Sequence, residues 1–84
     1  MPLTEPTGVY GHPSVIYARV GRVWAALLGL PEIDAETVCL MLSGMKLARQ
    51  TIKPKDDNLV DAAGYVECAA MCRERASRCS LPLP

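Results

Sequence analysis

The stretch from Met41 to Cys72 constrains the fold of this chain more than any other part of the sequence. Apolar residues recur there at the spacing of a helical face, stop at the short segment from Thr51 to Asp56, and resume beyond it. A connection this short folds two helices back on each other in an antiparallel pair. We therefore predict an all-α fold with a helical hairpin at its core.

The length and the charge balance limit what the chain can do. Its 84 residues suffice for one domain but lie near the lower limit for an independent core. Nine basic residues balance nine acidic ones, which argues against general binding of nucleic acids or anionic membranes. No apolar run reaches the roughly 18 residues of a membrane helix, and the first residues lack a signal-peptide pattern. We expect no membrane partner and a cytoplasmic location.

Local signals mark the ends of three helices. Pro13 suits the first turn of a helix, and Gly29 suits the left-handed residue that follows one. Asp34 is the expected N-cap of the second helix, and Asp56 or Asp57 is that of the third. We predict helices at about residues 13–28, 35–50 and 57–77 within one helical domain of residues 10–78, with a flexible arm at 1–9 and a loose tail at 79–84.

The apolar faces of the three helices differ in width. The first helix has one stripe that we expect to be buried: Ile16, Val20, Val23, Trp24 and Leu27. The second has a main stripe and a second apolar side: Val38, Met41, Leu42, Met45 and Ala48, with Leu40 and Leu47 opposite. Gly44 in its middle predicts a close approach by a neighbouring backbone. The third helix is apolar almost all round from Leu59 to Cys72, so we expect a homodimer or a larger homo-oligomeric bundle, built through the second and third helices.

The four cysteines, Cys39, Cys68, Cys72 and Cys79, are expected to face a reducing compartment. We favour buried free thiols that pack as small apolar side chains. The alternative is a zinc site that combines these thiols with His12, but their spacing matches no common zinc motif.

Two charged pairs are the main candidates for a binding site. Lys46 and Arg49 lie three residues apart and share one face of the second helix. Asp57 and Asp61 lie four apart and share one face of the third, and the loop segment Lys53-Pro54-Lys55 adds positive charge beside them. Arginine and lysine hold phosphates, while paired carboxylates bind Mg²⁺ or accept hydrogen bonds from a base or a sugar. The structural alternative is that the acids cap the helix and pair with the basic residues across the hairpin.

His12, Tyr10 and Tyr65 complete the set of candidate ligand-binding residues. His12 could contact a phosphate or act as a general base, although a lone histidine beside Pro13 is more often a local hydrogen-bonding residue. The tyrosines could stack on a nucleobase, and Tyr65 could equally belong to the core. The chain has no nucleophile with an evident base, no glycine-rich phosphate loop and no His-Glu-x-x-His motif. We therefore assign no catalytic residue and no metal ligand.

These motifs carry a family resemblance. Over about residues 10–72 the chain resembles a group of small bacteriophage proteins of unassigned function, through Tyr10-Gly11-His12-Pro13, Arg19, Trp24, the run from Met41 to Lys46-Leu47-Ala48-Arg49, and the block from Asp57 to Tyr65. The same block looks like the nucleotide-modification-associated helical domain of phage genomes. It is distantly similar to the all-α nucleoside triphosphate pyrophosphohydrolases of the MazG type, which are homo-oligomers that bind Mg²⁺ through acidic motifs. This chain has Lys46 and Arg49 instead of their acidic cluster, and an Asp-x-x-x-Asp spacing instead of Glu-x-x-Asp.

The resemblance implies a phage protein of the host-cell cytoplasm that binds a nucleotide or a nucleotide-like signal without a cofactor. Such a protein would serve phage nucleotide metabolism or sequester a host defence signal. Two alternatives stay open. One is a Mg²⁺-dependent nucleotide pyrophosphohydrolase with a degenerate metal site, and the other is a helical adaptor that docks on a host protein.

Overall fold

The computed structural model describes residues 11–80, and these form three helices and no strand. Helix α1 spans Pro13–Leu28, α2 spans Ala35–Ile52 and α3 spans Asp56–Ser80. The predicted all-α, three-helix fold is therefore confirmed. The predicted arm at residues 1–9 and Tyr10 lie outside the described residues, as does the chain beyond residue 80. Helix α3 extends to Ser80, into the range that we expected to be tail.

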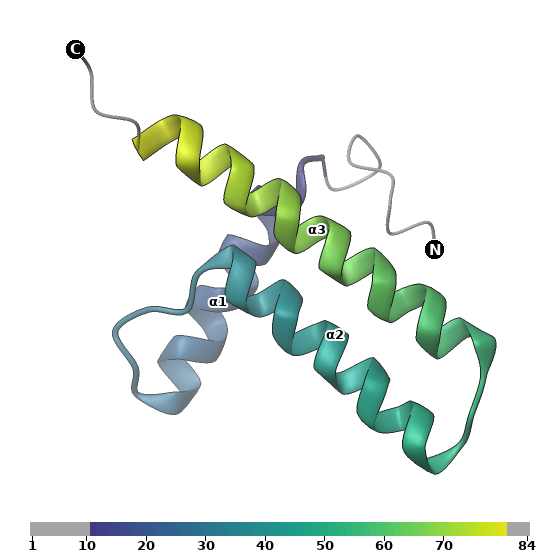
Figure 1. Ribbon diagram of the computed structural model, residues 1–84. Coiled ribbons are helices and arrows are strands. Elements are labelled where there is room, and N and C mark those ends of the chain that lie inside the picture. Colours follow the sequence, from purple (N-terminus) through teal and green to yellow (C-terminus); the bar gives the residue numbers. More distant parts are fainter. Residues whose placement is uncertain (1–10, 81–84) are drawn as a thin grey trace.

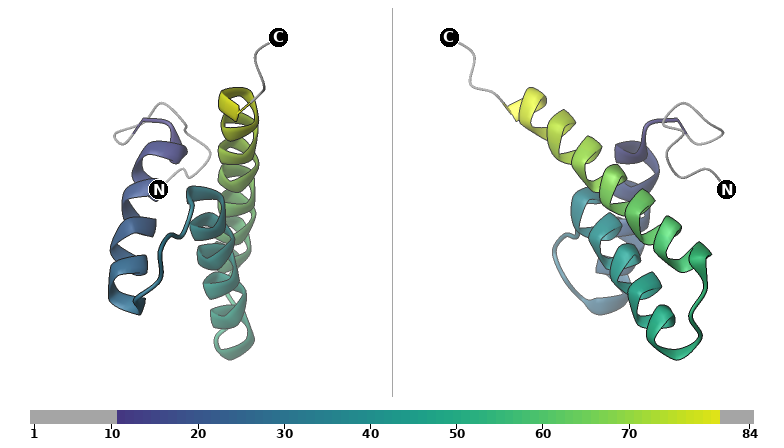
Figure 2. Two further views of the ribbon diagram at one scale, coloured as in Figure 1. Left: turned by 90° about the vertical axis from the view of Figure 1, so that its left-hand side faces the viewer. Right: turned by 45° about the vertical axis from the view of Figure 1, so that its right-hand side comes forward.

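Helices α2 and α3 form an antiparallel hairpin, and α1 packs against one side of it (Figure 1). The most extensive contact joins α2 to α3, while α1 touches α2 more than α3. In the left view of Figure 2 the two hairpin helices overlap, and α1 stands to one side of them only. Within residues 11–80, no helix has both the length and the apolar character needed to cross a membrane.

Three of the four predicted helix-end signals are confirmed, and the first is Pro13, which begins α1. Gly29 adopts a left-handed φ of 69° and closes α1. The Asp34 carboxylate accepts a 2.8 Å hydrogen bond from the backbone N–H of Thr37 and caps the start of α2. Hydrogen bonding from the Thr37 side chain, and then from its backbone N–H, lowers the pKa of Asp34. The fourth prediction, that Asp56 or Asp57 caps the third helix, is wrong, because α3 already includes both residues in its first turn. There the two negative carboxylates interact favourably with the positive end of the helix dipole, and they do not cap the helix.

The close backbone approach occurs at Gly21 and not at Gly44. A Cβ atom added to Gly21 would overlap the carbonyl oxygen of Ile33 and lie 3.3 Å from Cγ2 of Val38. Because Gly21 has no side chain, the backbone of α1 can lie directly against Ile33, just before α2, and against Val38 in the first turn of α2. A Cβ atom on Gly44 would meet nothing within 4 Å, so the prediction of a close approach there is wrong.

The core consists of small side chains. Its largest fully buried residues are Val38 and Cys39, both in α2. The other buried apolar residues are Ala25, Ala62, Cys68, Ala69 and Cys72. The prediction of buried free thiols is thus confirmed for the three cysteines of this core, while the side chain of Cys79 lies outside the described set.

The predicted apolar stripes are only partly buried. On α1, Val23 and Leu27 are exposed, because the helix turns Gly21 and Ala25 toward its neighbours instead. On α2, the methionines and leucines of the stripes are mostly exposed: Leu40, Met41, Met45 and Leu47. The α2 side that faces α3 carries Ser43, whose hydroxyl is buried and donates a 3.0 Å hydrogen bond to a carbonyl of α3. Close helix packing thus uses small and polar residues, and it leaves the larger aliphatic ones outside.

Candidate functional site

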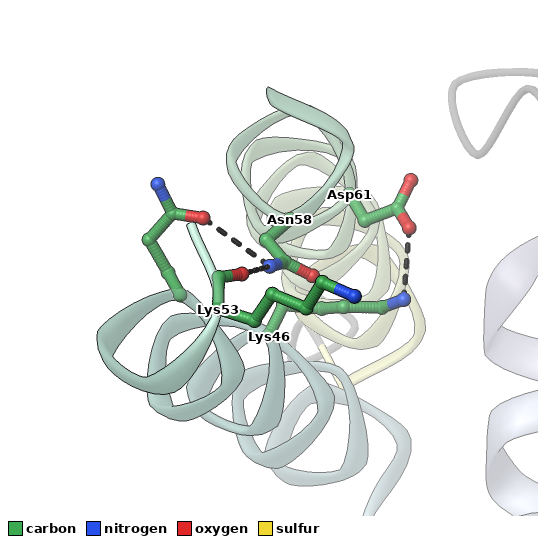
Figure 3. A network of polar contacts seen from close by, with 5 residues as sticks. Lys46, Lys53, Asn58 and Asp61 are labelled. Atoms are coloured by element: carbon green, nitrogen blue, oxygen red, sulfur yellow. Dashed lines mark hydrogen bonds and ion pairs between the residues drawn. The ribbon is translucent and has the colours of Figure 1, made fainter. Parts of the chain in front are cut away.

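An ion pair crosses the hairpin between Lys46 of α2 and Asp61 of α3. The Lys46 ammonium lies 2.9 Å from Oδ2 of Asp61, and the two side chains are 18% and 28% exposed. Figure 3 shows both side chains reaching across the space between the helices to meet each other. The structural alternative foreseen for the charged pairs is therefore present for these two residues.

The loop after α2 is held by two amide side chains. The buried Asn58 donates hydrogen bonds from Nδ2 to Oε1 of Gln50 at 3.2 Å and to the carbonyl oxygen of Lys53 at 3.3 Å (Figure 3). The same Gln50 oxygen accepts a 2.9 Å hydrogen bond from the backbone N–H of Lys55. We did not predict this pair of amides. The available signal was two amide residues flanking a proline-containing loop, whose backbone groups need partners.

A surface depression of about 300 Å³ lies beside this loop. Seven residues line it: Lys46, Arg49, Lys53, Lys55, Asp57, Asn58 and Asp61. The two basic and two acidic residues predicted as a site thus line one hollow, together with both lysines of the loop. The short turn brings them together, because the end of α2 and the start of α3 lie side by side.

The depression is positively charged overall. Its four cations outnumber its two carboxylates and leave a formal charge of +2. Arg49, Lys53 and Lys55 form no ion pair with any residue between 11 and 80, and neither does Asp57. The first turn of α3 adds the partial positive charge of a helix N-terminus. The arrangement can therefore attract an anion and supply several donors to it.

Tyr65 lies next to this depression without lining it. Its ring packs edge-to-face on Tyr17 of α1, with ring centroids 6.3 Å apart and planes at 72°. Burial raises the pKa of Tyr65, and the nearby Lys46 opposes that effect. Burial and the neighbouring Tyr65 raise the pKa of Tyr17 to about 12. Tyr65 is thus half-buried, with the edge of one ring packed against the face of the other in its contact with Tyr17.

His12 lies at the opposite end of the molecule. It is the N-cap of α1: its Nδ1 accepts a hydrogen bond from the backbone N–H of Ser14 at 3.1 Å and lies 2.8 Å from the Ser14 hydroxyl. Burial, and then the positive charge of Arg75, lower the pKa of His12 and favour the neutral imidazole. Arg75 and Asp61 lie on the same helix about 21 Å apart at 1.5 Å per residue. The structure therefore does not bring His12 to the depression.

Residues 4–73 match a protein family described as a domain of unknown function (DUF6378). The chain belongs to this family. No curated protein and no solved structure matches the chain. The matched range includes α1, α2 and most of α3. All seven residues that line the depression therefore lie within the DUF6378 domain.

Metal-binding groups are sparse in the described part of this DUF6378 protein. Among residues 11–80, no three His, Cys, Asp or Glu side chains form a group that could hold a metal ion. Cys39, Cys68 and Cys72 gather in the core, but burial raises the pKa of each thiol and keeps it protonated. Asp57 and Asp61 could each offer an oxygen to Mg²⁺ only if a bound phosphate supplied further ligands.

Proposed function

We propose that this DUF6378 protein binds a nucleotide or a nucleotide-like signal through its phosphates, in the depression between the end of α2 and the start of α3. The observation that carries the proposal is that three of the four lining cations, Arg49, Lys53 and Lys55, have no ionic partner among the described residues. A planar guanidinium and two ammonium groups around one hollow suit a phosphate.

Lys46 and Asp57, which also line the depression, have different roles in the proposed binding. Lys46 is held by Asp61, so it adds positive charge without being free to follow the ligand. Asp57 has no ionic partner within residues 11–80 and can accept a hydrogen bond from a sugar hydroxyl or a base amine. About 300 Å³ is at the lower end of ligand pockets, so we expect the phosphates to occupy the hollow and the nucleoside to lie over its rim.

Binding is favoured over hydrolysis by the composition of the hollow. A Mg²⁺-dependent pyrophosphohydrolase must neutralise one or more divalent ions, and only two carboxylates line this depression, one of them paired with Lys46. We therefore propose a phage protein of the host cytoplasm that holds a nucleotide for phage metabolism or sequesters a defence signal. The Mg²⁺-dependent enzyme is the second candidate.

The test is calorimetric titration of the purified protein with a panel of nucleoside mono-, di- and triphosphates and cyclic nucleotides, with and without Mg²⁺. We expect binding without Mg²⁺ and no release of pyrophosphate. Arg49→Ala should weaken the affinity about tenfold to a hundredfold, which is the loss of one or two charge-assisted hydrogen bonds. The matched control is Arg22→Ala, since Arg22 is exposed on α1 away from the depression.

Three results would overturn the proposal in different ways. An equal loss of affinity in both arginine variants would mean a nonspecific charge effect. Mg²⁺-dependent release of pyrophosphate would establish the enzyme. No binding of any nucleotide, with a folded protein, would leave the protein adaptor as the remaining function.

The proposal includes self-association, as a homodimer or a larger homo-oligomer. Its support is the number of large apolar side chains that the described residues leave exposed, on all three helices. A host protein could cover some of them in the adaptor alternative. A second copy of the chain is the partner that we propose, because it is present wherever the protein is.

A further inference from the structure

One face of the α2–α3 hairpin points away from α1. Val38 of α2 faces α1, since a Cβ atom on Gly21 would lie 3.3 Å from its Cγ2. Leu40 is two residues further on, which is about 200° around a helix, so it points to nearly the opposite side of α2. We call this side the outer hairpin face. On α3, Leu59 lies two residues before Asp61, whose side chain meets Lys46 on the side toward α1, so Leu59 points to nearly the opposite side (Figure 3). The residues of the outer hairpin face are Leu40, Gly44 and Leu47 of α2 and Leu59, Ala63, Val66 and Ala70 of α3.

The outer hairpin face is exposed and free of charge. Its four large side chains are each about half exposed: Leu40 at 49%, Leu47 at 50%, Leu59 at 49% and Val66 at 51%. Its small residues are exposed as well, and the position of a Cβ atom on Gly44 is open space. An ion pair between Glu36 and Arg73 bridges the two helices one turn beyond Leu40 and Ala70. A continuous apolar face of this kind marks an interaction surface.

The interior of the molecule explains why this face needs a cover. The buried core contains no leucine, isoleucine or methionine among the described residues, and these larger side chains lie outside it. Among residues 11–80 the buried core side chains are alanines, cysteines and one valine, so a chain of this length has little apolar burial to stabilise it. The larger aliphatic residues of the hairpin can contribute only when another surface covers them.

The dimensions and the pattern of the face fit a second copy of the same hairpin. From Leu59 to Ala70 the face runs about 17 Å along α3, and two helices about 9 Å apart make it about 18 Å wide. The projected area of about 300 Å², enlarged by the relief of the side chains, belongs to the smaller specific interfaces, those that bury less than about 1,200 Å² in total. Large residues alternate with glycine and alanine, so ridges on one copy meet hollows on a two-fold-related copy.

We propose that two copies of this protein pack their outer hairpin faces together and form an antiparallel four-helix bundle, with α1 of each copy on the outside. The absence of charge disfavours a charged peptide and matches a partner with the same face. The proposal rests on the self-association proposed above but not on nucleotide binding. The cationic depression opens on another side of the hairpin, beside the ion pair of Lys46 and Asp61, so both depressions of the dimer stay accessible.

Sedimentation equilibrium of the full chain and of three variants tests the interface. The wild type should have twice the 9.1 kDa chain mass. Leu47→Glu and Val66→Glu should each raise the dimer dissociation constant at least about a hundredfold, since each places two carboxylates in an interface without water. The matched control, Leu27→Glu, changes a 79% exposed leucine of α1 and should leave the dimer intact. Circular dichroism checks that each variant keeps its helices.

A mixing experiment keeps the test decisive if a single variant loses structure. Leu47→Glu and Leu47→Lys, each monomeric alone, should form a 1:1 dimer when combined, because the interface then holds one carboxylate and one ammonium instead of two like charges. The proposal would be overturned if the wild type is monomeric at every concentration tested. It would also be overturned if the Leu47→Glu and Val66→Glu variants remain dimeric. Dissociation by Leu27→Glu would overturn it too, because it would put the interface on α1. A stable dimer that binds no nucleotide would leave this proposal standing and overturn only the proposed ligand.

Discussion

Replacing Asn58 with alanine tests how the loop that carries Lys53 and Lys55 is held in place. Asn58 is 8% exposed, and its amide donates two hydrogen bonds, to Gln50 and to the carbonyl of Lys53. Each bond contributes about 1 kcal/mol net, so losing both costs about 2 kcal/mol. Alanine has a higher helix propensity than asparagine, which offsets about 0.5 kcal/mol of this loss. We expect a net loss of about 1.5 kcal/mol in the free energy of unfolding.

Urea unfolding followed by circular dichroism measures this difference, and a thermal melt should show a midpoint lower by about 6–12 °C. The control is Glu67→Ala, an exposed position on the same helix, which should change the stability by less than about 0.5 kcal/mol. A stability of Asn58→Ala within that margin of the wild type, or an equal loss in the control, would mean that the two hydrogen bonds do not stabilise the loop. Asn58→Asp adds a sharper check, because a carboxylate keeps the size but cannot donate, and it should be at least as destabilising as alanine.

Three further predictions follow from the packing and the charges. Gly21→Ala should destabilise the fold by about 1–3 kcal/mol, because its Cβ atom would overlap a backbone carbonyl. In the Leu47→Glu variant, which lacks the proposed interface, Gly44→Ala should stabilise α2 by about 0.5–1 kcal/mol, because its Cβ atom would meet nothing within 4 Å. Denaturant titrations that rank the two glycine variants equally would contradict the assigned packing. A double-mutant cycle of Lys46→Ala and Asp61→Ala should give a coupling free energy of only about 0.5–1 kcal/mol, since both side chains are partly exposed. A coupling free energy of zero in low salt would mean that the ion pair does not form in solution. Burial raises the pKa of the Cys39 thiol, so above about pH 8.5 the unfolded chain loses this proton while the folded chain keeps it. Stability should therefore fall as the pH rises from about 8 to about 10, and Cys39→Ala should reduce that fall; an unchanged slope in the variant would exclude this thiol as its source.

Much of the fold could be read from short-range signals. Asp34 caps α2 by bonding to a backbone N–H three residues away, and Gly29 closes α1 through its own left-handed backbone. Such interactions form within one helical turn and depend on little outside it. The third helix shows where these signals are ambiguous, because Asp56 and Asp57 suit a first turn as well as a cap. The charged hollow was also predictable in part, since a short loop must place Arg49 near Asp57.

The sequence by itself therefore determined the three helices, the hairpin and the gathering of charge at its turn. Only the tertiary structure decided which side of each helix is buried, because burial depends on what packs against it. An apolar pattern cannot show that Ser43 faces α3 while Leu47 stays exposed, or that Gly21 and not Gly44 meets a neighbouring backbone. It also cannot show that His12 lies far from Lys46, since that distance follows from how α1 crosses the hairpin.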